Sequence, residues 1–136
     1  MDMKKARDSD CSLLANLNHQ LILDEGHRSS TTIGQLEKRM KEWLSADYDA
    51  YIFWLDAEPI GYVLFRVDAE FIYVRQLFVH RDYRRRGLGR SAFHWLNENV
   101  WQEQLVRIDV LSNNGIGIAF WRSIGFDDYC ITMERG

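Results

Sequence analysis

The sequence has few residues of the kinds that crosslink a chain or hold a metal ion. Its two cysteines, Cys11 and Cys130, lie far apart and match no metal-ligand spacing. We therefore expect two buried thiols in a reducing compartment rather than a disulfide. The run from Asp24 through Glu25 to His27 offers two adjacent carboxylates and one imidazole, but this set lacks a defined ligand geometry. No metal site is predicted.

Long apolar runs are also absent. The first ten residues, MDMKKARDSD, lack the apolar segment of a signal peptide, and no run approaches the ~20 residues that span a bilayer. We therefore expect a cytoplasmic protein without a membrane partner. The 136 residues include one proline and no repeats or low-complexity tracts, and 46% of them are hydrophobic. These features predict a single domain over residues 1–136 with a sizeable core.

Acidic residues outnumber basic ones overall, but the basic residues are concentrated in one stretch. The formal net charge is −3, yet six arginines lie between positions 75 and 90. A nucleic-acid-binding surface would need a broad basic face, so this compact cluster argues against a nucleic-acid partner. Gly87 and Gly89 follow three of these arginines directly. Because the charge coincides with glycines, a phosphate site is favoured over a merely solvated charge run.

Hydrophobic periodicity predicts both helices and strands. Apolar residues recur at helical spacing in two early segments, and Thr32 with Gln35 fits a capping box at the start of the second. Three apolar, β-branched segments joined by short turns then predict an antiparallel meander. A helix separates its third strand from the next one, so these two strands are expected to be parallel. The predicted strands are 3–6, 50–56, 60–67, 71–79, 105–111 and 126–133, and the predicted helices are 11–24, 33–44, 90–100 and 116–124.

The stretch from Phe71 to Trp95 carries the clearest functional signal. It predicts a strand, a basic loop with two glycines, and the start of a helix. Glycine lets the backbone approach a ligand closely, and a helix N-terminus offers unpaired N–H groups with a partial positive charge. Arginine adds forked donors that suit phosphate oxygens. The stretch is therefore predicted to cradle a phosphorylated ligand, with a pyrophosphate as the favoured group.

Taken in order, these segments resemble the GNAT superfamily of N-acetyltransferases. The loop motif of that family, R/Q-x-x-G-x-G/A, is filled by Arg84, Gly87 and Gly89. Three further segments carry the resemblance: QLFV at 76–79, DV at 109–110 followed by Asn114, and AFWRSIGF at 119–126. The resemblance implies an α+β fold with a mixed, mostly antiparallel sheet, a splayed parallel strand pair and about four flanking helices.

The resemblance also implies the reaction. The chain would be an enzyme that uses acetyl-CoA as its acyl donor and transfers the acetyl group to a primary amine of a small molecule or peptide by direct attack. Backbone groups of Leu77, Phe78 and Val79 would pair with the pantetheine arm, and Asn114 would touch the cofactor. The residues implied to hold the pyrophosphate are those of the loop: Arg84, Arg85, Arg86, Gly87, Leu88, Gly89 and Arg90.

Candidates for catalysis and acceptor binding follow from the same comparison. Asp109 matches a position where some members carry a catalytic Glu, and Tyr73 is a second candidate for a base or a water-holding group. Their alternative roles are a loop anchor and a half-buried strand aromatic. Asp24 and Glu25 follow the first helix, where the family usually binds its acceptor, and could attract a cationic amine. Arg28 in the same loop could equally hold a carboxylate.

One position departs from the family pattern. Many members have a tyrosine in the last helix that protonates the leaving thiolate, but Trp121 stands there in this chain, and an indole N–H cannot titrate. Core packing is the favoured role for Trp121. The departure keeps open an alternative function, a catalytically weak acyl-CoA-binding or sensor module of the same fold. Exposed strand edges near the C-terminus leave a homodimer as an option.

Overall fold

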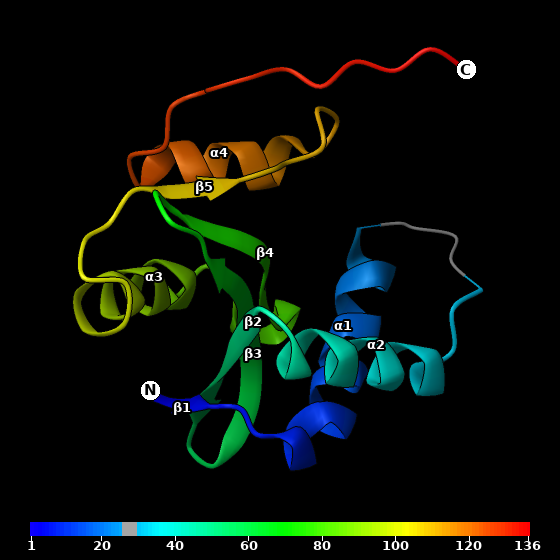
Figure 1. The fold of residues 1–136 in the computed structure, drawn as a ribbon. Helices are drawn as coiled ribbons and strands as arrows, with labels where there is room; N and C mark the ends of the chain where they lie inside the picture. The colour runs from blue at the N-terminus through cyan, green and yellow to red at the C-terminus, as the bar shows by residue number, and fades with distance from the viewer. Residues whose placement is uncertain (26–29) are drawn as a thin grey trace.

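The computed structural model describes residues 1–25 and 30–136. Helices and strands follow one another along this part of the chain (Figure 1). The strands are β1 (Asp2–Lys5), β2 (Tyr48–Leu55), β3 (Glu58–Val67), β4 (Ile72–Val79) and β5 (Val106–Ile108). The helices are α1 (Cys11–Asp24), α2 (Ile33–Ser45), α3 (Leu88–Asn99) and α4 (Gly115–Ser123), with short 3-10 helices η1 (Asp8–Asp10) and η2 (Arg81–Tyr83).

The strands form one mixed sheet in the order β1–β2–β3–β4–β5. The pairs from β1 to β4 are antiparallel, whereas β4 and β5 are parallel. The short turns between β2, β3 and β4 force antiparallel pairing, and the crossover through α3 allows the parallel pair. The predicted α+β fold class, with its meander and its parallel pair, is confirmed.

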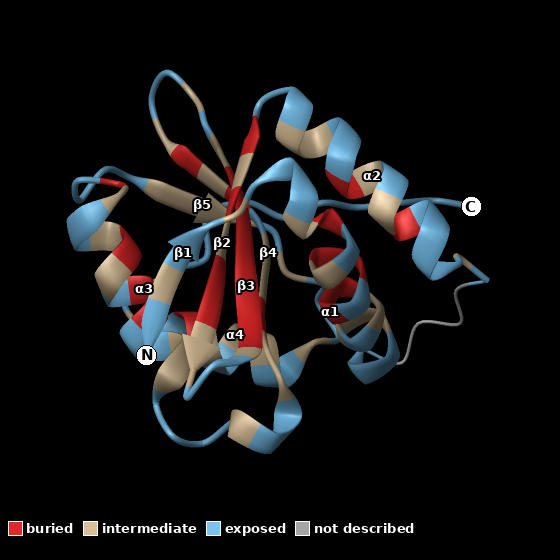
Figure 2. Ribbon diagram, turned by 90° about the horizontal axis from the view of Figure 1, so that it is seen from below, coloured by how far each residue is buried: buried red, intermediate tan, exposed pale blue. Residues whose placement is uncertain are grey.

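The helices cover both faces of the sheet. One buried cluster joins α1 and α2 to sheet residues that include Leu64 and Phe78. A second cluster joins α3 and α4 to the opposite face, which includes Phe65 and Val74. Figure 2 shows that β3, between these layers, is buried along most of its length. Successive residues of a central strand therefore face different helices, and each helix layer is anchored by alternate residues.

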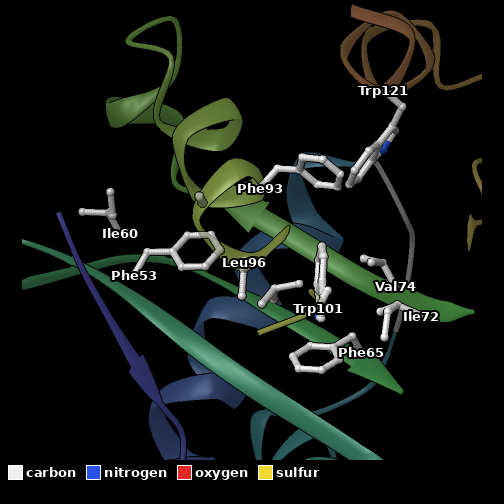
Figure 3. Close-up of a cluster of buried hydrophobic side chains, with 11 residues drawn as sticks. Phe53, Ile60, Phe65, Ile72, Val74, Phe93, Leu96, Trp101 and Trp121 are labelled. Atoms are coloured by element: carbon white, nitrogen blue, oxygen red, sulfur yellow. The ribbon is translucent and has the colours of Figure 1, made fainter. Parts of the chain in front are cut away.

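Aromatic rings hold α3 between the sheet and α4 (Figure 3). The Trp101 ring is fully buried and lies 5.4 Å from the Phe65 ring and 5.7 Å from the Phe93 ring, centroid to centroid. The Phe93 ring lies 6.3 Å from the Trp121 ring of α4. Such edge-to-face contacts add to the stabilisation from burial. These contacts fix the middle of α3 and the turn after it relative to β3 and α4.

The start of α2 confirms the predicted capping box. The Gln35 backbone N–H donates to Thr32 Oγ1 at 3.1 Å, and the Thr32 backbone N–H donates to Gln35 Oε1 at 2.8 Å. This reciprocal pair satisfies two donors at the helix end and fixes where α2 begins. No helix in residues 1–25 and 30–136 is long and apolar enough to cross a membrane.

The predicted C-terminal strand over residues 126–133 is wrong. This segment forms no regular structure, and Figure 1 shows it running past α4. Its alternating pattern suits a strand, but a strand also needs a neighbouring edge, which a local pattern cannot supply. Two hydrogen bonds from Arg122 to Asp128, at 3.1 and 2.7 Å, instead tie the start of the segment to α4. Ile131 and Met133 are left exposed, and so is Cys130, so the expectation of two buried thiols is confirmed for Cys11 and wrong for Cys130.

Candidate functional site

The parallel strands β4 and β5 separate partway along β4. Their pairing ends at Val74 and Ile108, while β4 continues to Val79 alongside β3. The predicted strand 105–111 is therefore shorter than expected, because residues 109–111 diverge from β4. Beyond Val74, the edge of β4 that faced β5 has no neighbouring strand in the described part of the chain. Its backbone N–H and C=O groups are open to a ligand.

A cleft of about 1230 Å³ opens where the two strands separate. It brings together most of the residues that the sequence analysis named: Asp24, Glu25, Leu77, Phe78, Val79, Arg84, Arg85, Gly87, Leu88, Gly89, Arg90, Asp109 and Asn114. Arg86 and Tyr73 are not part of the lining, and Arg28 lies outside the described residues. Among the described residues, no group of three His, Cys, Asp or Glu side chains is placed to hold a metal ion.

The loop before α3 presents backbone N–H groups to the cleft. Arg85 and Gly87 have left-handed backbone conformations, with φ of 63° and 70°. The Gly87 carbonyl accepts the first helical hydrogen bond of α3, so the N–H groups at 88–90 open out of the helix end. Gly89 has little room for a side chain, because an added Cβ would lie 3.2 Å from the Phe120 ring. This arrangement suits an anion.

Two arginines of the loop are held by neighbouring elements. Arg84 bridges β4 and α1, because its guanidinium donates to the Val79 carbonyl at 2.8 Å and to Asp24 Oδ2 at 2.8 Å. Arg90 donates to the carbonyl of Ser123, at the end of α4, at 3.0 Å. Both arginines line the cleft. Their hydrogen bonds fix the loop while their charge raises the electrostatic potential of the cavity.

The start of α4 brings a second helix N-terminus to the same cleft. Asn114 is the N-cap, and its Oδ1 accepts from the Gly117 backbone N–H at 2.9 Å. This contact satisfies one of the donors at the start of α4. Asn114 and Gly117 both line the cleft. The N-termini of α3 and α4 therefore both favour negative charge in one cavity.

Asp109 and Tyr73, named separately from the sequence, are hydrogen-bonded to each other. The Tyr73 hydroxyl donates to Asp109 Oδ2 at 2.9 Å. Burial is the main cause that raises the pKa of Tyr73, and Asp109 raises it further. The phenol therefore stays protonated at neutral pH and acts as a donor rather than a base. Of the two groups, the Asp109 carboxylate lines the cleft and is placed to accept a proton there.

The acidic residues at the end of α1 lie on the α1–α2 side of the cleft. Asp24 forms an ion pair with Arg84, with 2.8 Å between Oδ2 and a guanidinium nitrogen. Most of the attraction that Asp24 could exert on a cationic amine is therefore already offset. Glu25 also lines the cleft, and its side of the cavity continues into α2.

The sequence analysis missed three polar residues on this α1–α2 side: Asn18, Arg39 and Arg75. Asn18 is buried, and its Oδ1 accepts from the Arg39 guanidinium at 2.9 Å. A signal was present, because Asn18 falls on the apolar stripe of its helix, one turn from Leu14 and Leu21. A polar residue on a buried helix face needs a hydrogen-bond partner, so its presence indicates a buried hydrogen-bond network.

Trp121 occupies the position where many relatives have a tyrosine, and its predicted core role is confirmed. It is 7% exposed, and its ring lies 5.0 Å from the Phe120 ring and 5.1 Å from the Phe126 ring. Trp121 also lines the cleft, as does Tyr83, which lies in η2 before the loop that leads into α3. Among the aromatic residues of the lining, Tyr83 is the one that carries a hydroxyl.

Sequence comparison identifies a known family. A sequence model of the Acetyltransferase (GNAT) family matches residues 17–126, which include the β4–loop–α3 segment and the start of α4. No curated protein gives a significant match.

Structural comparison gives the same fold at low sequence identity. A possible acetyltransferase from Clostridium difficile 630 has a TM-score of 0.81 at 18% identity, over 99% of this chain and 95% of that chain. The aminoglycoside N-acetyltransferase AAC(6')-Iy in complex with CoA has a TM-score of 0.79 at 15% identity, over 99% and 93%. A predicted acetyltransferase with acetyl-CoA from Clostridium acetobutylicum has a TM-score of 0.79 at 15% identity, over 99% and 95%.

Proposed function

Because the chain belongs to the GNAT family of acetyltransferases, we propose that it transfers an acetyl group from acetyl-CoA to a primary amine. The observation that carries this proposal is the open edge of β4, which leads through a short loop into the N-terminus of α3. An extended pantetheine arm fits an open strand edge, and a pyrophosphate fits a helix N-terminus. The similar structures that contain CoA or acetyl-CoA support the same donor.

The two ends of the donor have separate binding groups in this proposal. Backbone groups of residues 77–79 pair with the pantetheine arm as an added strand would. The N–H groups of residues 85–90 hold the pyrophosphate, and Arg84 keeps the loop in place through its bond to Asp24. Asn114 contacts the donor from the start of α4.

The chemistry requires a neutral amine beside the thioester. A primary amine has a pKa of about 10.4 and is mostly protonated at neutral pH, so we assign its deprotonation to Asp109, directly or through water. Tyr73 orients that carboxylate. The nitrogen attacks the thioester carbonyl, whose developing negative charge is stabilised by an N–H of Leu77 or Phe78. The C–N bond forms and the C–S bond breaks. The nitrogen then loses its further proton to water, and the thiolate gains a proton from water or Tyr83.

Two measurements test this function. Millimolar acetyl-CoA should raise the melting temperature, because a ligand that binds only the native state stabilises it; AMP at the same concentration is the control. A panel of primary amines should then release free CoA thiol. Absence of a thermal shift would contradict donor binding. Binding without thiol release from any amine would favour the alternative, an acyl-CoA-binding or sensor module.

We also propose that two copies pair through β5. The outer edge of β5 has no neighbouring strand among the described residues, and Ile131 and Met133 in the C-terminal segment are 82% and 84% exposed. Pairing that segment with β5 of a second chain would cover both. Light scattering should give the mass of a dimer, and a double substitution of Ile131 and Met133 by Lys should give a monomer. A monomeric unmodified chain would rule the pairing out.

A further inference from the structure

Two arginines on the α1–α2 side of the cleft pack on the same tryptophan ring. Arg39 lies on α2 and Arg75 on β4, and both line the cleft. Both guanidiniums pack on the ring of Trp43, with their Cζ atoms 4.6 and 4.9 Å from the ring centroid. Stacking on one indole holds the two cations in a fixed arrangement.

Arg75 and Gln76 share one side of the sheet because β4 contains a β-bulge. Val74 and Gln76 pair with adjacent residues of β3, so Arg75 has no residue opposite it. An extra residue reverses the alternation of side chains along the strand. Gln76 accordingly accepts from the Tyr62 hydroxyl at 2.8 Å, within the layer that packs on α1 and α2. Arg75 and Gln76, although consecutive, both face the α1–α2 side.

The two cations lack an anionic partner. Among the described residues, no carboxylate lies within ion-pairing distance of Arg39 or Arg75. Other arginines near the sheet do have one: Arg66 lies 2.7 Å from Asp68, and Arg84 is paired with Asp24. Three carboxylates line the cleft, those of Asp24, Glu25 and Asp109.

The network behind Arg39 is also incomplete. Within residues 1–25 and 30–136, the buried donors Arg39 Nε and Asn18 Nδ2 have no hydrogen-bond partner. Burial, and to a smaller degree the positive charge of Arg75, lowers the pKa of Arg39. An unpaired buried donor and an uncompensated like charge both cost stability. A bound anion would remove both costs.

We propose that the acceptor carries a carboxylate next to its amine, and that Arg39 and Arg75 bind this carboxylate while the amine faces the thioester. This inference rests on the proposed acetyl transfer and narrows its acceptor to amino acids and similar amino carboxylates. A planar carboxylate matches the guanidinium fork, which a diffuse polycation does not. Polycationic amines such as aminoglycosides would meet two like charges on this side.

The test compares pairs of amines that differ only in the carboxylate. Lysine is compared with cadaverine, and phenylalanine with phenethylamine, by thiol release at fixed acetyl-CoA. We expect kcat/KM for the amino acid of each pair to be higher by on the order of tenfold or more. A hydrogen bond to a charged group contributes about 1.5–3 kcal/mol, and about 1.4 kcal/mol corresponds to a tenfold change. Kanamycin should be the poorest substrate.

Variants assign the effect to the two arginines. Arg75→Met should raise KM for the amino acids about tenfold to a hundredfold, with kcat and the KM for the decarboxylated amines changing within about twofold. Arg75→Glu should reverse the preference toward diamines. Arg39→Lys keeps the positive charge but loses the forked donor geometry, so it should raise KM for the amino acids less than Arg75→Met does. Arg66→Met, which removes a cation outside the cleft, is the matched control and should leave the preference unchanged.

The outcomes separate this inference from the acetyl-transfer proposal. If acetyl-CoA gives no thermal shift, the donor proposal fails. Where acetyl-CoA binds, two results overturn the carboxylate inference. One is that the decarboxylated amines react as well as the amino acids, and the other is that Arg75→Met affects both members of a pair equally. If CoA binds and no amine reacts, the same pairs are compared by the additional thermal shift of the CoA complex, and an equal shift within each pair overturns the inference.

Discussion

The two sides of the cleft are built from different kinds of groups. On the side of α3 and α4, the donor groups for a ligand are mainly backbone N–H groups at the open edge of β4 and at two helix N-termini, with Arg84 and Arg90 beside them. On the side of α1 and α2, side chains supply the polar groups, among them Asn18, Arg39 and Arg75. The first side suits a group that is the same in every member of a family. The second side can change with single substitutions, and this is what acceptor choice requires.

The largest expected effect concerns Asp109, where the two sides meet. Asp109→Asn keeps an acceptor for the Tyr73 hydroxyl but removes the base, so kcat should fall about 100-fold to 10,000-fold, the usual contribution of a general base. Tyr73→Phe, the matched variant, leaves the carboxylate and should reduce kcat much less. Stopped-flow or steady-state thiol release measures both. Unchanged kcat in Asp109→Asn would show that water alone deprotonates the amine.

A second prediction targets the backbone-built side alone. In Gly89→Val, the new side chain must displace the Phe120 ring, which already lies 3.2 Å from a Cβ at this position. We expect acetyl-CoA affinity to fall on the order of a hundredfold, or about 2.7 kcal/mol, by calorimetry. Gly34→Ala, where the nearest atom is 3.9 Å away, should bind normally. If Gly89→Val binds acetyl-CoA as tightly as the unmodified chain, the loop does not hold the donor.

A third prediction asks how strongly the two sides are connected. Asp24→Asn removes the ion pair with Arg84, which is also bonded to the Val79 carbonyl. The pair is partly exposed, so we expect only a two- to fivefold rise in the KM for acetyl-CoA, or up to about 1 kcal/mol. The preference between lysine and cadaverine should not change. A changed preference would show that Asp24 takes part in acceptor binding after all.

The smallest effect is on stability at alkaline pH. Burial is the main cause that raises the pKa of Tyr62 far above its ordinary value of 10.0. The folded chain therefore keeps a proton that the unfolded chain loses, and this stabilisation is complete below pH ~10 and declines as pH rises further, by about 1.4 kcal/mol per unit. Tyr62→Phe should flatten this decline in urea unfolding between pH 10 and 11. An unchanged slope would mean that other groups set it.

The backbone-built side could be predicted from the sequence, because its signals are local. The glycines at 87 and 89, expected beside a helix start, and the capping box at Thr32 each depend on a few neighbouring residues, and the structure places them at the starts of α3 and α2. The strand order followed from connection lengths. The single domain over residues 1–136 and the cytoplasmic location stay predictions.

The side-chain-built side could not be predicted in the same way. Arg39 and Arg75 are 36 positions apart and pack on one tryptophan ring only because α2 covers the face of the sheet on which Arg75 lies. The failure at residues 126–133 has a related cause, since a strand depends on an edge elsewhere in space. Long-range contacts of this kind leave weak traces, such as Asn18 on an apolar helix stripe.

The bulge in β4 has a consequence for how this strand can vary. In a regular strand, odd and even positions face opposite layers. The extra residue at position 75 shifts this alternation by one, so even-numbered residues face α3 and α4 in 72–74 but face α1 and α2 in 76–79. A substitution at position 75 changes one side chain. A deletion there would restore the regular alternation, and Leu77 and Val79 would keep facing the layer of α3 and α4, to which they belong. Residue 75 can therefore be exchanged or lost without turning the rest of β4 over, and a deletion would remove the pair of neighbouring side chains at 75 and 76 on the α1–α2 side.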